Sequence, residues 1–508
     1  MMNRRHFIKN LSIIAGSGLA MAPGMQALAK IVEPAPSALS SKAQFARALK
    51  NNPALIGFAN ITENFALKAL TIEGKMPGDL SGTLYRIGPA GHERGNLRYS
   101  HLFEGDGMLH SFNFSDGKIF HQGKFINTPK FATEKQAGKF LYSGPDTKIS
   151  GALAVHHADS INPSNTNVIS VGDKLWTLWE AGSPMQVNPQ TLDSRDWANL
   201  GQNSPFEQSL KGMPFSAHPK IDPGGDIFNF GLNGNGQAVF YHLSANGRMK
   251  NAAVVDAGYR GMLHDFLITH KHVLLILPSL SPNGTGKGFF ERTRFEKEQP
   301  MRVLVIDKAE LTIKKSYQLP PGFAFHFGNA WEERDGTIHF DASLYPDVSS
   351  LHNLSTLMQG EVGKHTNRSQ TVLYTLKPNG GFTQQYIDGD SEFPRIYDHL
   401  VGQRNRLLYT TGNKNNTLWA DSIRRLNTDT GAVDEYYYGE DYLVEEHVIT
   451  TTKAREGSGY LLGTALHVPS KRTCINLFQA DNLSQGPVMR AWLPYHIPLG
   501  FHGNFQRA

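Results

Sequence analysis

Four histidines stand in local sequence that is unusual for a titratable side chain. Small or apolar residues flank each of them at the start or end of a β-like run: His218 in FSAHPKIDP, His264 in GMLHDFLIT, His326 in FAFHFGNAW and His502 in GFHGNF. An imidazole in such company needs a hydrogen-bond partner or a metal for its ring nitrogens. For any one of them, the simplest interpretation is a core histidine whose ring nitrogens are hydrogen-bonded. Four of them together favour a shared metal.

The ligand types available narrow the kind of metal site. Cys474 is the single cysteine of the 508 residues, so the chain has neither a thiolate cluster nor a disulfide framework. A metal would therefore be held by nitrogen and oxygen ligands. Because the four histidines are far apart in sequence, they cannot lie on one helix, and separate elements must bring them together.

From about Asn60 onward the sequence predicts an all-β protein. Apolar alternation, as in FNFSDGKIFHQGKFI and GTIHFDASLY, is interrupted by turn pairs at Asp116-Gly117, Asn246-Gly247, Asp335-Gly336, Asn379-Gly380 and Thr430-Gly431. Fifty Gly and 27 Pro fit many tight connections. Helical spacing is limited, and its best examples are residues 41–55 and 349–360.

Many short strands with regular turns are typical of a sandwich, a barrel or a propeller. A sandwich of this length would need several domains, and no linker is visible between residues 60 and 508. One large closed propeller fits best. In a propeller the inner strands of different blades converge on one axis, which is where four distant histidines could share a metal.

The ordered motifs resemble the carotenoid cleavage oxygenase family, which includes apocarotenoid oxygenases and lignostilbene dioxygenases. The strings SAHPK, HDF, FHFGNA and FHGNF match its four iron-ligand motifs in order, and GTLYRIGPAG and HLFEGDGMLHSF are similar to two earlier segments. Ile87 stands where the family usually has Asn, and Glu104 where it has Asp. The resemblance implies a seven-bladed β-propeller with a few helices and long loops capping an axial active site, and one Fe(II) per chain. His218, His264, His326 and His502 would be its ligands and form the catalytic centre.

The resemblance also implies three glutamates that orient the histidine ligands. Glu180 in LWEAGSP and Glu392 in SEFPRI match the family pattern. The third lies in YLVEEHVI, where Glu446 aligns best and Glu445 is the alternative. His447 replaces the usual proline at that point.

The implied activity is oxidative cleavage of a conjugated C=C bond by O2, with two carbonyl products and no organic cofactor. A carotenoid or apocarotenoid is the preferred substrate. The alternative is a phenolic stilbene, for which Tyr99 and Lys130 lie at positions compatible with the substrate-binding pair of lignostilbene enzymes. A further alternative is a non-catalytic propeller that binds a ligand. An isomerohydrolase finds no support beyond the shared metal site.

The first residues predict export. Arg4 and Arg5, a short apolar run and the Ala27-Leu28-Ala29 pattern form a twin-arginine signal, with cleavage near Ala29 and a periplasmic product. Residues 30–59 would be a linker with a short helix, and 60–508 a single propeller domain. Loss of the signal removes three positive charges from a formal net charge of +5, so nucleic acid is not an expected partner. The expected partners are a hydrophobic polyene or aromatic alkene and O2. An apolar substrate is compatible with transient contact with a membrane surface, and no obligate protein partner is evident.

Overall fold

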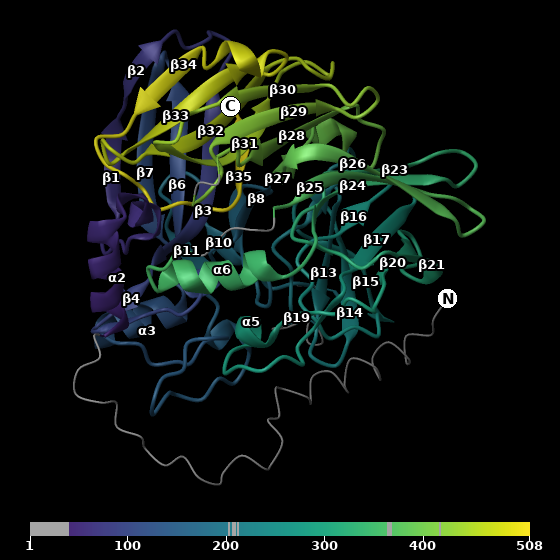
Figure 1. Ribbon diagram of the computed structural model, residues 1–508, viewed down its shortest axis with the longest axis horizontal. Coiled ribbons are helices and arrows are strands. Elements are labelled where there is room, and N and C mark those ends of the chain that lie inside the picture. Colours follow the sequence, from purple (N-terminus) through teal and green to yellow (C-terminus); the bar gives the residue numbers. More distant parts are fainter. Residues whose placement is uncertain (1–39, 202–203, 206–209, 211–212, 363–367, 416–417) are drawn as a thin grey trace.

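Seven antiparallel sheets form a ring in the computed structural model, which describes residues 40–201, 204–205, 210, 213–362, 368–415 and 418–508 (Figure 1). The seven-bladed β-propeller implied by the sequence resemblance is confirmed. The signal predicted at residues 1–29 and the linker up to residue 39 lie outside the described residues.

Each blade has four or five strands in meander order. In sheet order, blade 1 is β1 (Phe65–Ala69), β7 (Lys118–Phe125), β6 (Asp106–Ser115), β3 (Gly82–Gly91) and β35 (Gly503–Arg507), and blade 2 is β11 (Ser194–Trp197), β10 (Met185–Val187), β9 (Lys174–Leu178) and β8 (Asn167–Val171). Blade 3 is β12 (Lys220–Ile221), β13 (Ile227–Leu232), β14 (Gln237–Leu243) and β15 (Met249–Asp256), and blade 4 is β16 (Leu267–Ile268), β17 (His272–Leu277), β20 (Met301–Asp307) and β21 (Ile313–Leu319).

The last three blades follow the same plan. Blade 5 is β22 (Phe323–Ala324), β24 (Ile338–Tyr345), β25 (Gln370–Leu376) and β26 (Phe382–Asp390), with β23 (Ala330–Glu332) also paired to β24. Blade 6 is β27 (Glu392–Arg395), β28 (Leu407–Gly412), β29 (Ser422–Asn427) and β30 (Val433–Tyr437), and blade 7 is β31 (Tyr442–Thr450), β32 (Tyr460–His467), β33 (Arg472–Gln479), β34 (Met489–Trp492) and β2 (Thr71–Gly74). Two short ribbons, β4 (Glu93–Arg94) with β5 (Leu97–Arg98) and β18 (Leu280–Ser281) with β19 (Arg294–Phe295), lie outside the blades.

Both ends of the described chain close the ring. Strand β2 pairs with β34 at the outer edge of blade 7, and β35 pairs with β3 in blade 1. Strand β35 also contacts β8 of blade 2 and β31 of blade 7, so it lies on the inner side of its blade. His502 directly precedes β35. Ring closure therefore carries this histidine to the axis and explains why the C-terminal segment is apolar.

The five turn pairs predicted from the sequence all lie in hairpins, between β6 and β7, β14 and β15, β23 and β24, β25 and β26, and β29 and β30. Asp116 and Gly117 both have positive φ, 50° and 72°, which suits the two-residue hairpin whose twist matches that of the strands. The ladder between β6 and β7 runs without a register shift from this turn, whereas the ladder between β14 and β15 shifts between His242 and Leu243, next to the Asn246-Gly247 turn.

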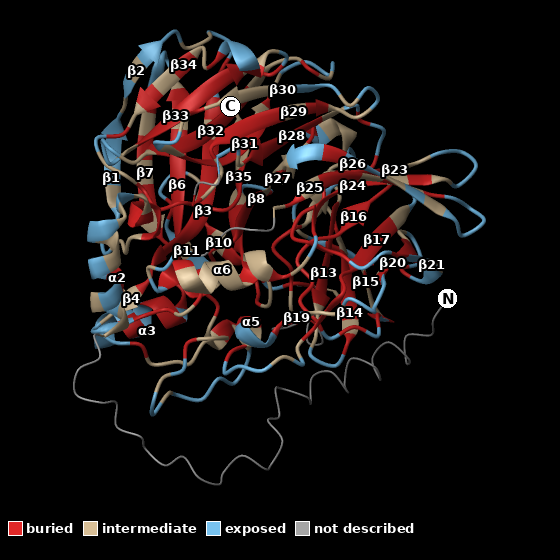
Figure 2. Cartoon of the chain, in the orientation of Figure 1, coloured by how far each residue is buried: buried red, intermediate tan, exposed pale blue. Residues whose placement is uncertain are grey.

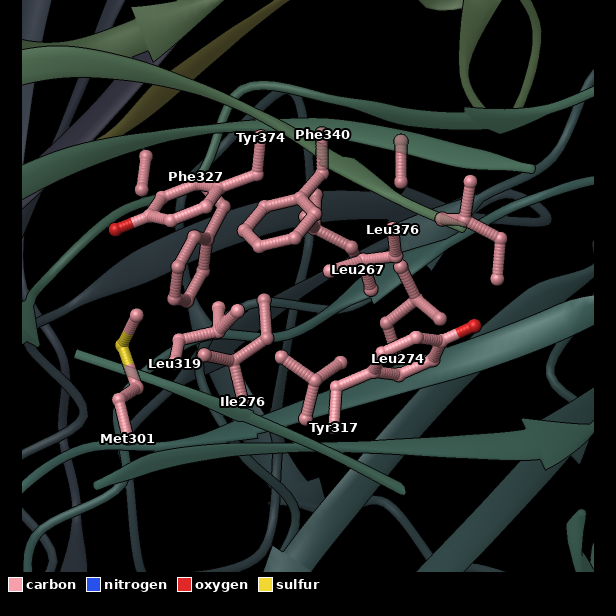
Figure 3. Packing of buried hydrophobic residues seen from close by; sticks show 14 of the residues in the cluster. Leu267, Leu274, Ile276, Met301, Tyr317, Leu319, Phe327, Phe340, Tyr374 and Leu376 are labelled. Atoms are coloured by element: carbon pink, nitrogen blue, oxygen red, sulfur yellow. The ribbon is translucent and has the colours of Figure 1, made fainter. Parts of the chain in front are cut away.

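Apolar side chains between neighbouring blades form the core. Figure 2 shows that the buried residues are concentrated in the strands of the blades. One cluster joins blades 4 and 5, where Leu274 and Ile276 of β17 pack with Phe340 of β24 and Tyr374 of β25 (Figure 3). Full burial of one such side chain contributes about 1.5–3 kcal/mol. Clusters of this kind lie between all neighbouring blades, so the closed ring buries both faces of each blade among the described residues.

A few helices lie at the loop end of the ring. They are α2 (Ser41–Asn51), α3 (Pro129–Ala137), α5 (Phe289–Arg292) and α6 (Ser349–Met358), with the short 3-10 turns η1 (Pro53–Phe58), η2 (Leu102–Glu104) and η3 (Ala158–Ser160). Two further 3-10 turns belong to blades 6 and 7: η4 (Asp398–Leu400) follows β27, and η5 (Leu483–Gln485) precedes β34 and contacts β29 and β30. Helix α6 contacts α5, η1 and η2, so these elements form one cap (Figure 1). Helices α2 and α6 lie within the two ranges whose spacing predicts a helix. None of the described helices has the length and apolar character needed to cross a membrane.

Candidate metal centre

The four histidines lie at equivalent places in four blades. His218 and His264 precede the inner strands β12 and β16, His326 lies between β22 and β23, and His502 precedes β35. Their candidate ligand nitrogens all lie within 4.8 Å of one another. Each side chain is only 5 to 7% exposed. The convergence expected from the sequence is therefore present, and it is produced by blades that are far apart along the chain.

The distances between the ring nitrogens suit one central ion. The Nε2 atoms of His218 and His264 are 2.9 Å apart, those of His264 and His326 3.2 Å, and those of His326 and His502 3.2 Å. Two imidazoles at about 2.1 Å from one metal are about 3.0 Å apart at a right angle and about 3.4 Å apart at the tetrahedral angle. The 2.9 Å distance fits a right angle, and the two distances of 3.2 Å lie between the two values, so all three suit ligands of one ion.

Three of the rings are oriented by carboxylates on their outer side. The Nδ1 atom of His264 lies 2.5 Å from Oε1 of Glu180, and that of His326 lies 2.5 Å from Oε2 of Glu392. The Nδ1 of His502 lies 2.9 Å from Oε1 of Glu446. His218 is the one ring against which the described residues place no carboxylate. Each of these carboxylates comes from a blade other than the one that carries its histidine.

The ring nitrogens of this arrangement favour a bound cation. A carboxylate only accepts hydrogen bonds, so each Nδ1 that faces one carries the proton, and the Nε2 of the same ring is left with a lone pair. The Nε2 lone pairs of His264, His326 and His502 then point at one place with no donor among them. A metal ion accepts all three and removes their repulsion. Neutral imidazole is also the form that binds divalent transition metals.

Burial and charge favour these protonation states. Burial lowers the pKa of His218 well below its ordinary value, and the three neighbouring imidazoles lower it further. Burial likewise lowers the pKa of His502 to about 4, although Glu446 acts in the opposite direction. For Glu446, burial raises the pKa, but Arg395 and His502 outweigh it, and the carboxyl pKa falls well below its usual range. These directions favour neutral imidazoles at His218 and His502 and an ionised Glu446. At His264 burial also lowers the pKa, but the carboxylates of Glu180, Asp265 and Glu392 outweigh it, and the pKa of this imidazole is raised.

The two consecutive glutamates of β31 have different partners. Glu446 accepts hydrogen bonds from the Gly503 N–H (2.8 Å) and from Arg395, whose Nε and Nη2 each lie 2.9 Å from one of its oxygens. Glu445 instead forms an ion pair with Arg86. The residue that aligned best from the sequence, Glu446, is thus the one against His502. Sequence reasoning did not identify Arg395, although it lies in the same SEFPRI string as Glu392.

Phe393 is a second residue that sequence reasoning did not identify. Its φ of 51° is in the left-handed region, which a bulky residue rarely adopts. Its ring centroid lies 5.0 Å from that of His326 and 5.4 Å from that of His502. In a regular strand Phe393 and Glu392 would point to opposite faces. The unusual backbone turns both toward the axis, so that Glu392 holds an imidazole and Phe393 covers two of them.

A cavity of about 1690 Å³ leads to this centre. Its lining includes His264, His326 and His502 as well as aromatic side chains such as Phe103, Phe325, Phe393, Trp419 and Phe501. Leu153 and Val155, which are 49% and 37% exposed, also line it, so the cavity reaches the surface. A long apolar molecule could therefore extend from solvent to the metal centre.

Tyr99 and Lys130 do not line this cavity. They line a small neighbouring pocket, and Phe103, Trp179 and Phe290 border both spaces and so form the wall between them. Lys130 is only 5% exposed, and its Nζ lies 2.5 Å from the Tyr99 hydroxyl and 2.7 Å from Oδ1 of Asp106.

Lys130 follows a proline, but it lies in a helix and is buried, so it is not part of a surface turn. Pro129 begins helix α3, which Thr128 caps by accepting a hydrogen bond from the Phe131 N–H (3.1 Å).

Comparison with known proteins is consistent with this geometry. The family model described as retinal pigment epithelial membrane protein (RPE65) matches residues 58–507. Apocarotenoid-15,15'-oxygenase of Synechocystis is 26% identical, with 85% of this chain and 92% of that protein covered. Lignostilbene-alpha,beta-dioxygenase isozyme III of Sphingomonas paucimobilis is 26% identical over 86% of this chain and 94% of that protein. The crystal structure of cobalt-substituted Synechocystis ACO superposes with a TM-score of 0.78 at 24% identity, covering 90% of this chain and 99% of that one.

Proposed function

The chain belongs to the RPE65 and carotenoid cleavage oxygenase family, and on that basis we propose that it is an iron(II) dioxygenase that cleaves a conjugated C=C bond of an apocarotenoid or carotenoid. Its relatives are named oxygenases and dioxygenases, which supports an enzyme of this type. His218, His264, His326 and His502 would hold one Fe(II) per chain, and Glu180, Glu392 and Glu446 would orient three of the rings.

This proposal depends on one observation: three of the four histidines line the cavity. Three lone-pair nitrogens converge at the inner end of a cavity whose walls are mainly apolar. Fe(II) held there by neutral imidazoles would keep its positive charge and would supply activation of O2 beside an alkene. Cleavage of the double bond by O2 places one oxygen atom on each carbonyl product and needs no outside reductant.

Glutamates orient the imidazole rings, and aromatic residues exclude water from the metal centre. Glu392 and Glu446 accept the Nδ1 protons of His326 and His502 and keep each Nε2 unprotonated, and the Glu180 carboxylate, 2.5 Å from Nδ1 of His264, faces the third ring. Phe393 and Phe103 pack on the imidazoles, since the Phe103 ring stacks on His264 with a centroid distance of 6.5 Å and an angle of 8°. These aromatic faces can hold a flat conjugated chain next to the metal centre and keep bulk water away from it.

The volume and lining of the cavity favour the apocarotenoid class. Ligand pockets for drug-sized molecules usually measure about 300–1,000 Å³, so a cavity of about 1690 Å³ is larger than a compact aromatic substrate needs. Two of the groups that could recognise a phenol, Tyr99 and Lys130, are occupied with each other and with Asp106 behind the aromatic wall.

A phenolic stilbene is the second candidate, and the small pocket is the observation that favours it. Tyr99 and Lys130 share that pocket with Phe103 and Phe290, which also line the main cavity. A rotation of either phenylalanine would join the two spaces. A phenol could then reach the Lys130 ammonium from the metal side.

The test is to incubate Fe(II)-loaded protein with an apocarotenal and, separately, with a 4-hydroxystilbene under isotopically labelled O2. We expect two aldehydes from the apocarotenal, with label in both carbonyl groups. His264→Ala should abolish turnover, whereas His270→Ala, which changes an exposed histidine in the same stretch, should not. Turnover of the stilbene but not of the apocarotenal would mean that a phenolic stilbene is the substrate. No turnover of either, together with no bound iron, would favour a ligand-binding propeller.

A further inference from the structure

The consecutive glutamates of β31 serve two different parts of the C-terminal segment. Glu446 faces the imidazole of His502. Glu445 instead accepts a hydrogen bond from the backbone N–H of Gly500, which lies two residues before His502. Glu445 also accepts from the Thr464 hydroxyl and forms an ion pair with Arg86. Its side chain is 2% exposed and that of Arg86 is 6% exposed. Neither residue lines the cavity among the described residues, so neither can contact a substrate directly.

A β-bulge makes this double use possible. The register between β31 and β32 shifts between Val444 and His447, so both glutamates lie in the irregular part of the strand. In a regular strand two consecutive side chains alternate between opposite faces, and one of the two charges would point into an apolar blade interface. Here each carboxylate has its own arginine, Arg86 for Glu445 and Arg395 for Glu446. The charges of the two buried glutamates are therefore balanced locally.

The backbone that leads to His502 passes β3 at very short range. The Phe501 N–H donates to the Ile87 carbonyl and the Ile87 N–H donates to the His502 carbonyl, both at 2.9 Å. A Cβ added to Gly88 would lie 2.4 Å from the Cα of Gly500, and one added to Gly500 would lie 2.0 Å from Nη2 of Arg86. The chain is thus fitted between Gly88 and the guanidinium, and the Glu445 carboxylate accepts the N–H of Gly500 at this point.

We propose that Glu445 is a positioning residue for His502, with Arg86 as its counter-ion. Glu446 sets the rotation of the imidazole, and Glu445 sets the place of the backbone that carries it. The inference rests on the proposed metal site, because its consequence is a change in metal binding. Removing Glu445 alone also leaves the buried Arg86 charge without a partner, so the two effects must be separated.

Two matched double variants separate the loss of the hydrogen-bond acceptor from the effect of an unpaired Arg86 charge. Arg86→Met with Glu445→Gln removes both charges but keeps an acceptor for the Gly500 N–H, whereas Arg86→Met with Glu445→Leu removes both charges and the acceptor. The measurement is Co(II) affinity and the visible absorption spectrum of the Co(II)-loaded protein, which reports the geometry of the ligands. We expect the Gln variant to keep the wild-type spectrum and the Leu variant to bind about tenfold more weakly with a shifted spectrum.

A control variant and the wild type complete the design. Glu440→Gln changes an exposed glutamate just before β31 and should leave Co(II) binding unchanged. If the Leu variant does not fold, Arg86→Met with Glu445→Ala takes its place, since it also removes both charges and the acceptor, and it should show the same loss of affinity. A Leu or Ala double variant with wild-type affinity and spectrum would overturn the inference. Wild-type protein that binds neither Fe(II) nor Co(II) would instead overturn the proposed function.

Discussion

The Nδ1 of His502 lies 2.9 Å from Oε1 of Glu446, and the two residues are 56 positions apart, at the inner edges of blades 1 and 7. Blade 1 is completed only when β35 pairs with β3, and that pairing is what places His502 on the axis. Arg395 of blade 6 joins the same carboxylate through two hydrogen bonds. Closing the propeller and completing the metal site are therefore one structural event.

Glu446→Gln should weaken metal binding without unfolding the protein. The amide keeps the shape of the side chain but can no longer accept as a charged partner from both His502 and Arg395. We expect a loss of about 10–100-fold in Fe(II) or Co(II) affinity, measured by competition with a chelator. Glu440→Gln changes an exposed glutamate just before β31 and serves as the control. Equal affinity of the two variants would contradict the assigned role of Glu446.

Gly88→Ala should destabilise the fold, because the new methyl group would lie 2.4 Å from a backbone atom that cannot rotate away. Overpacking of this kind typically costs about 1–3 kcal/mol. The measurement is the free energy of unfolding in urea without metal. Gly78→Ala is the matched control, since a Cβ there meets nothing within 4 Å, and it should change stability by less than about 0.5 kcal/mol. A silent Gly88→Ala variant would mean that β3 and the C-terminal segment can separate.

His121 should make the protein sensitive to acid. Burial, with a contribution from Arg86, lowers its pKa from 6.5 to about 3. Between these values the unfolded chain binds a proton that the folded chain does not. Its contribution to stability is therefore fully present above pH 6.5 and is lost as the pH falls toward about 3, by about 1.4 kcal/mol per pH unit.

His121→Gln should flatten this dependence, which urea unfolding of the metal-free protein at several pH values would measure. The difference between variant and wild type reports His121 together with His110, whose Nδ1 lies 3.1 Å from Nε2 of His121 and whose pKa burial also lowers. It separates this pair from other buried groups such as Asp341, whose pKa burial raises to about 6. The same slope in both proteins would contradict the expectation.

Lys130→Met should lower stability more than it lowers apocarotenal cleavage. The ammonium lies 2.7 Å from Asp106 and 3.4 Å from Glu134, and all three side chains are buried. Breaking such a buried pair typically costs about 3–5 kcal/mol. Activity is therefore compared per folded molecule, with Lys135→Met on the exposed side of the same helix as the control. Loss of stilbene turnover in folded Lys130→Met, with no apocarotenal turnover in wild type, would favour the phenolic substrate.

Replacement of Arg4 and Arg5 by lysine should trap the precursor in the cytoplasm. Twin-arginine signals depend on the arginine pair, whereas general secretion signals need only positive charge. Cell fractionation of both forms, followed by N-terminal analysis of the exported protein, tests this. Unchanged export of the double variant would mean that the general secretion route reads the signal.

The local motifs determined the main part of the site. The four histidine strings and the strings around Glu180 and Glu392 could be identified without a structure, since each consists of a few consecutive residues whose types are unusual together. The turn pairs and the alternation between them were likewise enough for an all-β fold, because both depend on neighbouring residues. The number of blades came from the family resemblance, since the sequence shows no clear blade repeat.

Relationships between distant residues needed the tertiary structure. Glu445 and Glu446 are adjacent and chemically identical, and only the bulge in β31 and the positions of Arg86 and Arg395 decide which one faces His502. Tyr99 and Lys130 match the positions of a substrate-binding pair in the sequence, yet aromatic side chains lie between them and the main cavity. The left-handed backbone of Phe393 has no sequence signal, because it is imposed by the surroundings of β27. The types and order of the ligands are local properties that a sequence carries, whereas the partner of a buried charge depends on which blades meet when the ring closes.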